Sequence, residues 1–229
     1  METNQEYITC TYDLSIALKA YSIQALDAPE FDKLLIMLGN FHLEMAFYCA
    51  VGTYINESGA EHLLTESGIL AEGSLMGFIR GKHYNRCVRI HDILALAMER
   101  KLYESFQLTL LPEKLDEIKD ILKDMPDDVN LQEEFLSKNK CFQEHMAQYE
   151  QFFQDVIKGK HGPTAQYWGI YVYMISRVHR ELMHAVCTND IDAYSNILLI
   201  LIDIFFALNR PNYARWGILC YFKLTKAAP

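Results

Sequence analysis

The first forty residues combine two short apolar runs with one helical pattern. Residues 7–12 (YITCTY) are rich in β-branched and aromatic side chains, which is typical of a strand, and this run stops at Asp13. Residues 14–26 follow as a helix that Asp13 can cap, and this helix ends before Pro29. Residues 33–38 (KLLIML) form a second apolar run, which periodicity alone does not separate from a helix. We interpret the three segments as a βαβ unit with two parallel strands and one edge that is open or covered by a helix.

From residue 42 onward the spacing of apolar residues predicts only helices. One helix covers residues 42–56, and two short ones end at Gly68 and Gly81, because glycine is favoured just past a helix end. A long helix is predicted for 83–106, and two more for 164–187 and 191–208. The predicted fold is therefore mainly α, a helical domain preceded by one short N-terminal βαβ unit.

Residues 112–158 differ in composition from the rest of the chain. They contain 12 acidic and 6 basic residues, so this stretch carries −6 of the net charge of −9. Pro112 and Pro126 interrupt it, and we predict two exposed helices here. The predicted domain organisation is a βαβ segment at 1–41 and a helical domain at 42–229, with an acidic helical excursion at 112–158.

Composition narrows the class of protein. The chain has 229 residues and a net charge of −9, which argues against a general nucleic-acid coat protein because phosphate neutralisation needs excess positive charge. No two of the six cysteines form a CxxC pair, and residues 1–9 do not resemble a secretory leader, so we expect an intracellular protein. The longest apolar run, 197–208, contains Asp203 and is too short to span a membrane.

The densest polar cluster lies in residues 80–91. Residues 80–89 contain four basic side chains and no acidic one, and His83 and His91 accompany them. Helical spacing brings the basic residues close to one face, where they could bind phosphates. The alternative is a solvated face paired with acidic helices such as 112–128. The candidate nucleic-acid-binding residues are Arg80, Lys82, Arg86 and Arg89.

Other catalytic or metal-binding patterns are weak. His179, His184 and Cys187 have spacings that could suit zinc, but no fourth ligand follows at a fixed distance, and a buried core histidine is the commoner role for His179. The sequence contains no GxSxG motif and no glycine-rich phosphate loop. We therefore predict no metal site and no nucleophilic centre from these residues.

Several short phrases resemble those of a large family of transposon-encoded proteins. They occur in order along nearly the whole chain. The phrases are TYD (11–13), LGNFHLEM (38–45), AEGS (71–74), GKHYNR (81–86), GPTAQYW (162–168) and NYARW (212–216).

This resemblance implies a ribonuclease-H-like core of the kind found in DDE-type transposases. Such cores use acidic residues to hold two divalent metal ions such as Mg²⁺. By the resemblance, Asp13 would be the second acid, Asp192 a candidate for the third, and His42 would lie at the rim of the site. Residue patterns alone favour a helix cap as the role of Asp13 and a structural hydrogen bond as the role of His42. They also make Asp190 a competitor of Asp192 at the start of its helix.

The sequence departs from the family pattern before Asp13. Only twelve residues precede it, which is enough for one strand at about 3.3 Å per residue and not for the strand that carries the first acid. We therefore expect a C-terminal ribonuclease-H-like part without catalytic activity of its own, and no cofactor unless another chain completes a magnesium site. The alternatives are a helical protein-interaction module and a subunit that contacts DNA through residues 80–89.

Overall fold

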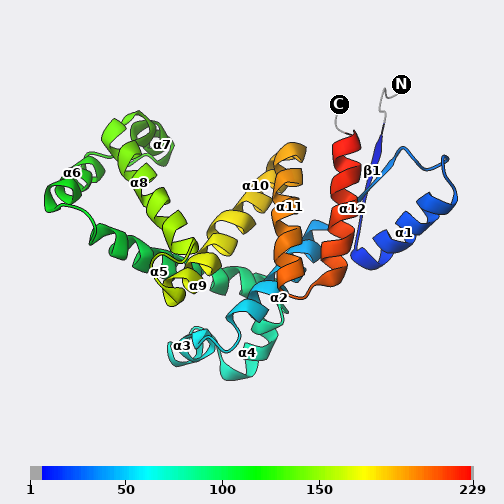
Figure 1. Cartoon of the computed structure of the whole chain (residues 1–229), viewed down its shortest axis with the longest axis horizontal. Helices are drawn as coiled ribbons and strands as arrows, with labels where there is room; N and C mark the ends of the chain where they lie inside the picture. Colours follow the sequence, from blue (N-terminus) through cyan, green and yellow to red (C-terminus); the bar gives the residue numbers. More distant parts are fainter. Residues whose placement is uncertain (1–6, 228–229) are drawn as a thin grey trace. The chain divides into compact units, whose positions relative to one another are not determined.

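The computed structural model describes residues 7–227, which form two compact units (Figure 1). The first unit contains residues up to Asp92 and residues from Met174 onward, and the second spans Ile93–Tyr173. The predicted boundary at residue 41 does not separate the two units: residues 7–41 lie in the first unit together with 42–92, and the acidic stretch 112–158 lies in the second. Helices dominate both units, so the prediction of a mainly α fold is confirmed.

The N-terminal segment forms the predicted βαβ unit. Strand β1 (Ile8–Tyr12) is followed by helix α1 (Leu14–Leu26) and strand β2 (Leu34–Leu38). The strands pair in parallel, with Cys10 opposite Ile36. Among the described residues, the two strands form a sheet of their own, with the order β1–β2.

The outer edge of β2 is closed by side chains instead of a third strand. The Tyr21 hydroxyl donates a hydrogen bond to the Ile36 carbonyl (2.8 Å), and the Cys220 thiol lies 3.9 Å from the same oxygen. The Gln24 amide donates to the carbonyls of Leu34 (2.7 Å) and Phe31 (2.6 Å). Because buried carbonyls must find donors, these side chains replace the hydrogen bonds that a neighbouring strand would supply.

Replacing Gln24 with leucine should destabilise the first unit. The side chain is buried, and its loss leaves two carbonyl groups without their donor. We expect the free energy of unfolding to fall by about 2 kcal/mol, measured by urea denaturation. Lys19→Leu on the exposed face of the same helix is the control and should change stability little. Equal stability of the two variants would show that the amide does not close this edge.

Among residues 7–227, no strand pairs with the outer edge of β1. The Ile8 amide donates to Lys33 (2.9 Å) and the Tyr12 carbonyl accepts from Gly39 (2.6 Å), so even-numbered residues of β1 bond to β2. The backbone groups of Thr9 and Thr11 therefore face the other side, and both residues are exposed. This agrees with the predicted open edge.

Helices complete the first unit. Helix α12 (Pro211–Ala227) packs against β2, where Trp216 stacks on Tyr21 of α1 at 5.7 Å. It also packs against α11 (Ile191–Ala207) along Gly217. Helix α2 (Asn40–Ile55) packs against α4 (Glu72–Ile79). The helices are α2 (Asn40–Ile55), α3 (Ala60–Glu66), α4 (Glu72–Ile79), the start of α5 (Tyr84–Gln107), the π-helical turn η1 (Met174–His179), α10 (Arg180–Thr188), α11 (Ile191–Ala207) and α12 (Pro211–Ala227).

The second unit contains the remainder of α5 and four further helices. These are α6 (Pro112–Lys123), α7 (Val129–Lys138), α8 (Lys140–Ile157) and α9 (Pro163–Tyr173). The prediction of two helices in 112–158 is wrong, because Asn139 caps α8 by accepting a hydrogen bond from the Phe142 amide (3.0 Å) and so separates it from α7. A ring cluster that includes Tyr103, Phe106 and Tyr149 packs α5 against α8.

The helix predicted for 164–187 is interrupted. Its residues form α9, η1 and α10 in succession, so the backbone widens to a π-helical turn over Met174–His179. None of the helices between residues 7 and 227 combines the length and the apolar composition that a membrane-spanning helix requires.

Candidate functional site

Asp13 is a helix cap at the carboxyl end of β1. Its carboxylate accepts hydrogen bonds from the Ile16 amide (2.9 Å) and the Ser15 hydroxyl (2.7 Å). Both hydrogen bonds lower the pKa of Asp13, and the bond from the Ile16 amide has the largest effect. The nearby His42 lowers this pKa by a smaller electrostatic effect. The helix-cap alternative is therefore observed, whereas a role of Asp13 in metal binding stays a prediction.

The remaining residues of the implied acidic site lie at helix starts. Asp190 caps α11 by accepting a hydrogen bond from the Ala193 amide (2.9 Å), while Asp192 is exposed in the first turn. His42 is exposed on α2, edge-to-face with Phe41. The upstream acids Glu2 and Glu6 lie outside the described residues. Within residues 7–227, no three His, Cys, Asp or Glu side chains are grouped so that they could share a metal ion.

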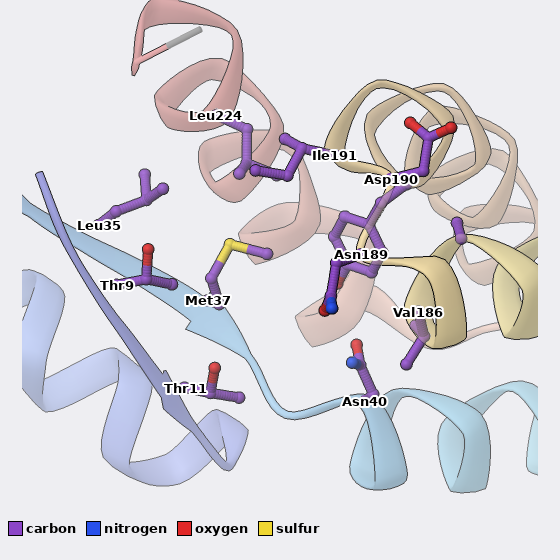
Figure 2. A pocket seen from close by; sticks show the side chains of 12 residues that line it. Thr9, Thr11, Leu35, Met37, Asn40, Val186, Asn189, Asp190, Ile191 and Leu224 are labelled. Atoms are coloured by element: carbon purple, nitrogen blue, oxygen red, sulfur yellow. The ribbon is translucent and has the colours of Figure 1, made fainter.

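A small pocket lies against one face of the two-stranded sheet, where residues of both strands line it (Figure 2). Its volume is about 220 Å³, and Thr9 and Thr11 of β1 line one side. Asn40 at the start of α2 and Asn189 in the turn before α11 point toward one another across it, while the Asp190 carboxylate is turned away. Sequence patterns did not indicate this pocket, because its residues come from segments 150 positions apart.

The four basic residues of the predicted nucleic-acid site are brought together around one turn. Arg80 ends α4, Lys82 lies in the turn, and Arg86 and Arg89 lie in the first two turns of α5. All four side chains are exposed, and none forms an ion pair with a carboxylate in the part of the chain that the structure describes. We call these four residues the basic segment.

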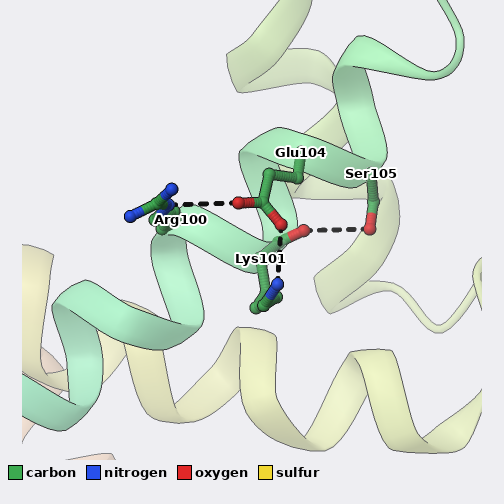
Figure 3. A network of polar contacts seen from close by, with 4 residues as sticks. All are labelled: Arg100, Lys101, Glu104 and Ser105. Carbon is green, nitrogen blue, oxygen red and sulfur yellow. Dashed lines mark hydrogen bonds and ion pairs between the residues drawn. The ribbon is translucent and has the colours of Figure 1, made fainter.

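The basic segment contrasts with the later part of α5. There Arg100 and Lys101 both bind Glu104, at 3.1 and 2.8 Å (Figure 3). Acidic neighbours thus neutralise exposed cations on α5 in the second unit but not those of the basic segment. Within the first unit, the described carboxylates form no ion pair with the basic segment, and its pairing with acidic helices such as 112–128 stays an alternative.

Glycine fixes the turn of the basic segment against α2. Gly81 has a φ of +66°, a conformation that side chains other than glycine rarely adopt. A Cβ atom there would lie 2.6 Å from the Cys49 nitrogen and 2.9 Å from the Met45 carbonyl oxygen. The turn therefore rests directly on the backbone of α2, which holds the basic side chains on a rigid support.

A buried polar network lies behind the basic segment. The Tyr84 hydroxyl donates a hydrogen bond to Glu44 (2.6 Å), and Glu44 also lies 3.3 Å from His179 Nε2. The Tyr48 hydroxyl is 3.0 Å from the same histidine nitrogen. Because Tyr84 begins α5, this network anchors the helix that carries Arg86 and Arg89. Sequence reasoning missed Glu44, although a lone carboxylate among the apolar residues of 43–55 was a detectable signal.

The histidines take structural positions. His91 is fully buried between the rings of Tyr48 (5.3 Å) and Phe78 (4.5 Å), so it does not belong to the exposed cationic surface. Burial, with a smaller effect of nearby His179, lowers the pKa of His91 to about 3. His179 is buried as the sequence analysis favoured, whereas His184 and Cys187 are exposed.

Comparisons with known proteins identify the family. A family model described as a domain of unknown function, DUF8702, matches residues 1–227. No curated protein and no solved structure matches the chain. The family description names no activity, so the resemblance to transposon-encoded proteins stays a proposal. Since the family model covers nearly the whole chain, the protein belongs to the DUF8702 family.

Proposed function

We propose that this chain is a transposon-derived, ribonuclease-H-like protein that contacts nucleic acid through the basic segment and performs no catalysis by itself. The observation that carries the proposal is the group of four exposed cations without carboxylate partners around a fixed turn. The parallel βαβ unit with an aspartate at the end of its first strand supports the ribonuclease-H-like part.

The geometry of the basic segment suits phosphate oxygens. Arg86 and Arg89 are three residues apart on α5, so their side chains leave neighbouring positions of one helix face. The segment lies at the N-terminus of a 24-residue helix, where the helix dipole favours negative charge. Arginine side chains can bind phosphate through two parallel hydrogen bonds. The excess of acidic residues lies outside this segment, with −6 of the net charge of −9 in residues 112–158.

In this proposal the acids serve structural roles. Asp13 and Asp190 cap helices. Asp192 lies in the first turn of α11, where the helix dipole stabilises a negatively charged carboxylate. Divalent metal such as Mg²⁺ would enter only if another chain added carboxylates to Asp13.

The proposal is tested by the salt dependence of DNA binding. We expect fluorescence anisotropy with a short labelled duplex to give a slope of log K against log salt of up to about −3.6, which is about 0.9 per neutralised phosphate. Replacing Arg80, Lys82, Arg86 and Arg89 with glutamine should remove this dependence and weaken binding at 50 mM salt by about 100-fold. Each single arginine variant should reduce the slope by about one unit.

A matched control separates position from net charge. Lys119, Lys123, Lys138 and Lys140 are exposed and paired with acidic neighbours on the helices of the second unit. Replacing these four lysines with glutamine gives the same net charge as the fourfold variant of the basic segment. It should leave the slope of log K against log salt unchanged. Equal weakening by both fourfold variants would contradict a localised site.

A helical protein-interaction module is the second candidate. Large apolar side chains are exposed on α11 and α12, among them Phe206 (80% exposed) and Phe222 (55%). Leu199 and Phe206 are seven residues apart, and Ile218 and Phe222 four apart, so each helix presents an exposed apolar stripe. This candidate becomes the better explanation if the wild-type chain does not bind duplex or single-stranded DNA at 50 mM salt.

A further inference from the structure

A second cavity, of about 520 Å³, lies in the first unit against the last turns of α12. Residues of α1, β2 and α12 line it, and it shares only Leu35 with the pocket of Figure 2. Its volume is within the roughly 300–1,000 Å³ of pockets that hold small organic molecules. The residue that gives this cavity its chemistry is Lys223 of α12, which lines it and is half-buried.

Two neutral groups hold the Lys223 ammonium in place. Its Nζ donates a hydrogen bond to Gln24 Oε1 and lies 4.9 Å from the centre of the Tyr21 ring. The orientation of the Gln24 amide is fixed, because its Nε2 donates to the carbonyls of Phe31 and Leu34. The ring of Tyr21 offers its negative face to the cation. The ammonium is therefore positioned at the wall of the cavity before any ligand binds.

The Lys223 ammonium forms no ion pair with a carboxylate among residues 7–227. Burial lowers its pKa, and Asp32, which also lines the cavity, raises this pKa by a smaller electrostatic effect. A charge that is withdrawn from water is costly unless it is paired. Because an ammonium has three N–H donors and Gln24 accepts from one of them, donors remain for a negatively charged group in the cavity.

The rest of the lining specifies the size and polarity of the ligand. The other described charged residues that line the cavity are Asp32 and Lys226, which are both exposed and have opposite signs. Their charges cancel, so one net positive charge remains, that of Lys223. Leu34 and Leu219 provide apolar surface. A matching ligand therefore combines one negative group with an apolar body.

We propose that this cavity binds the carboxylate of a small organic acid, which accepts a hydrogen bond from Lys223 Nζ while its apolar body packs against Leu34 and Leu219. A hydrogen bond between two charged groups is stronger than one between neutral groups, and a partly buried ion pair is screened little by salt. The chain has a net charge of −9, so the attraction of an organic acid must come from a local cation. No residue of the basic segment lines the cavity, so this inference does not depend on the proposed phosphate contacts.

The test is a chemical-shift titration of the isotope-labelled full chain with hydrocinnamate. We expect a dissociation constant of about 0.1–1 mM, which is ordinary for a ligand of this size. The largest shifts should occur in the backbone amides of α1 and α12 that border the cavity. Hydrocinnamamide has the same apolar body without the charge, and it should bind to the wild type about tenfold more weakly.

Variants assign the effect to one side chain. Lys223→Met keeps the length of the side chain and removes its charge, so it should weaken the binding of hydrocinnamate about tenfold and leave that of hydrocinnamamide unchanged. Lys19→Met removes a charge from an exposed position of α1 and is the matched control, which should bind as the wild type does. The glutamine variant of the basic segment should also bind hydrocinnamate normally, so failure of DNA binding and failure of this cavity are distinguishable.

A further arm identifies the source of the carboxylate. Tighter binding of acetyl-glycyl-phenylalanine than of hydrocinnamate would support the site and assign it to the end of a peptide, whereas weaker binding would support a free acid. Absence of shifts at about 10 mM hydrocinnamate, or unchanged affinity in Lys223→Met, would overturn the proposal. Equal affinity of the wild type for the acid and the amide would also overturn it, and that comparison does not depend on the folding of any variant.

Discussion

Gly52→Ala is expected to lower the free energy of unfolding by about 3 kcal/mol or more. Gly52 lies in α2 where α4 crosses it, and a Cβ atom there would approach the Ile79 carbonyl oxygen to 2.0 Å and its carbon to 2.7 Å. These are backbone atoms, so relief requires moving the end of α4 away from α2. Alanine favours an isolated helix by about 1 kcal/mol over glycine, but overpacking against a rigid backbone outweighs that gain.

The matched control for this variant is Gly73→Ala. Gly73 is also helical, in α4, and has nothing within 4 Å of the position that a Cβ atom would occupy. The Gly73→Ala substitution should therefore leave the free energy of unfolding unchanged or raise it by up to about 1 kcal/mol. Urea denaturation followed by circular dichroism measures both. Gly52→Ala at or above wild-type stability would mean that α2 and α4 are not packed this closely. The variant should also weaken DNA binding, since Ile79 directly precedes the basic segment.

The second large effect is a loss of stability in acid that depends on His91. Its pKa is about 3 in the folded protein because of burial, whereas an exposed histidine has about 6.5. The unfolded chain therefore takes up a proton below pH 6.5 that the folded chain does not. The contribution of His91 to the free energy of unfolding is therefore complete above pH 6.5 and decreases as the pH falls toward 3. The loss amounts to about 2–3 kcal/mol at pH 4.5, two pH units below the unfolded value.

The measurement is the free energy of unfolding between pH 7.5 and 4.5 for wild type and His91→Leu. The variant should be less stable at pH 7.5 but lose less stability on acidification. His145 is also buried and its pKa is lowered, so part of the trend remains in the variant. His184→Leu, at an exposed position, should keep the wild-type slope. Parallel curves for wild type and His91→Leu would show that His91 is protonated in the folded protein.

Local signals in the sequence were sufficient for the two strands but not for every helix boundary. The β-branched residues before Asp13 and the apolar run before Gly39 gave two strands within one residue of the observed ends, because strand and helix-cap preferences act over a few positions. The break at Asn139 was missed for a physical reason. The spacing of Phe135 and Phe142 fits one continuous helix, and a single cap residue ends it.

The candidate site was only partly predictable. The four cations of the basic segment are adjacent in sequence, so their clustering follows from local spacing. The buried network was not predictable, because Glu44 and His179 are 135 residues apart and meet only through tertiary packing. The pocket likewise brings together Asn40 and Asn189, which no local pattern connects.

The two edges of the small sheet differ in what they permit. Carbonyl groups on the β2 edge already have side-chain donors, so a strand arriving there would have to displace Gln24 and Tyr21 together. Along β1, the backbone groups of Thr9 and Thr11 face away from β2, and no other strand of the described part of the chain lies beside them. Any enlargement of this sheet, whether in a longer relative or in an engineered fusion, must therefore occur next to β1. The added strand would become a neighbour of the pocket that those threonines line.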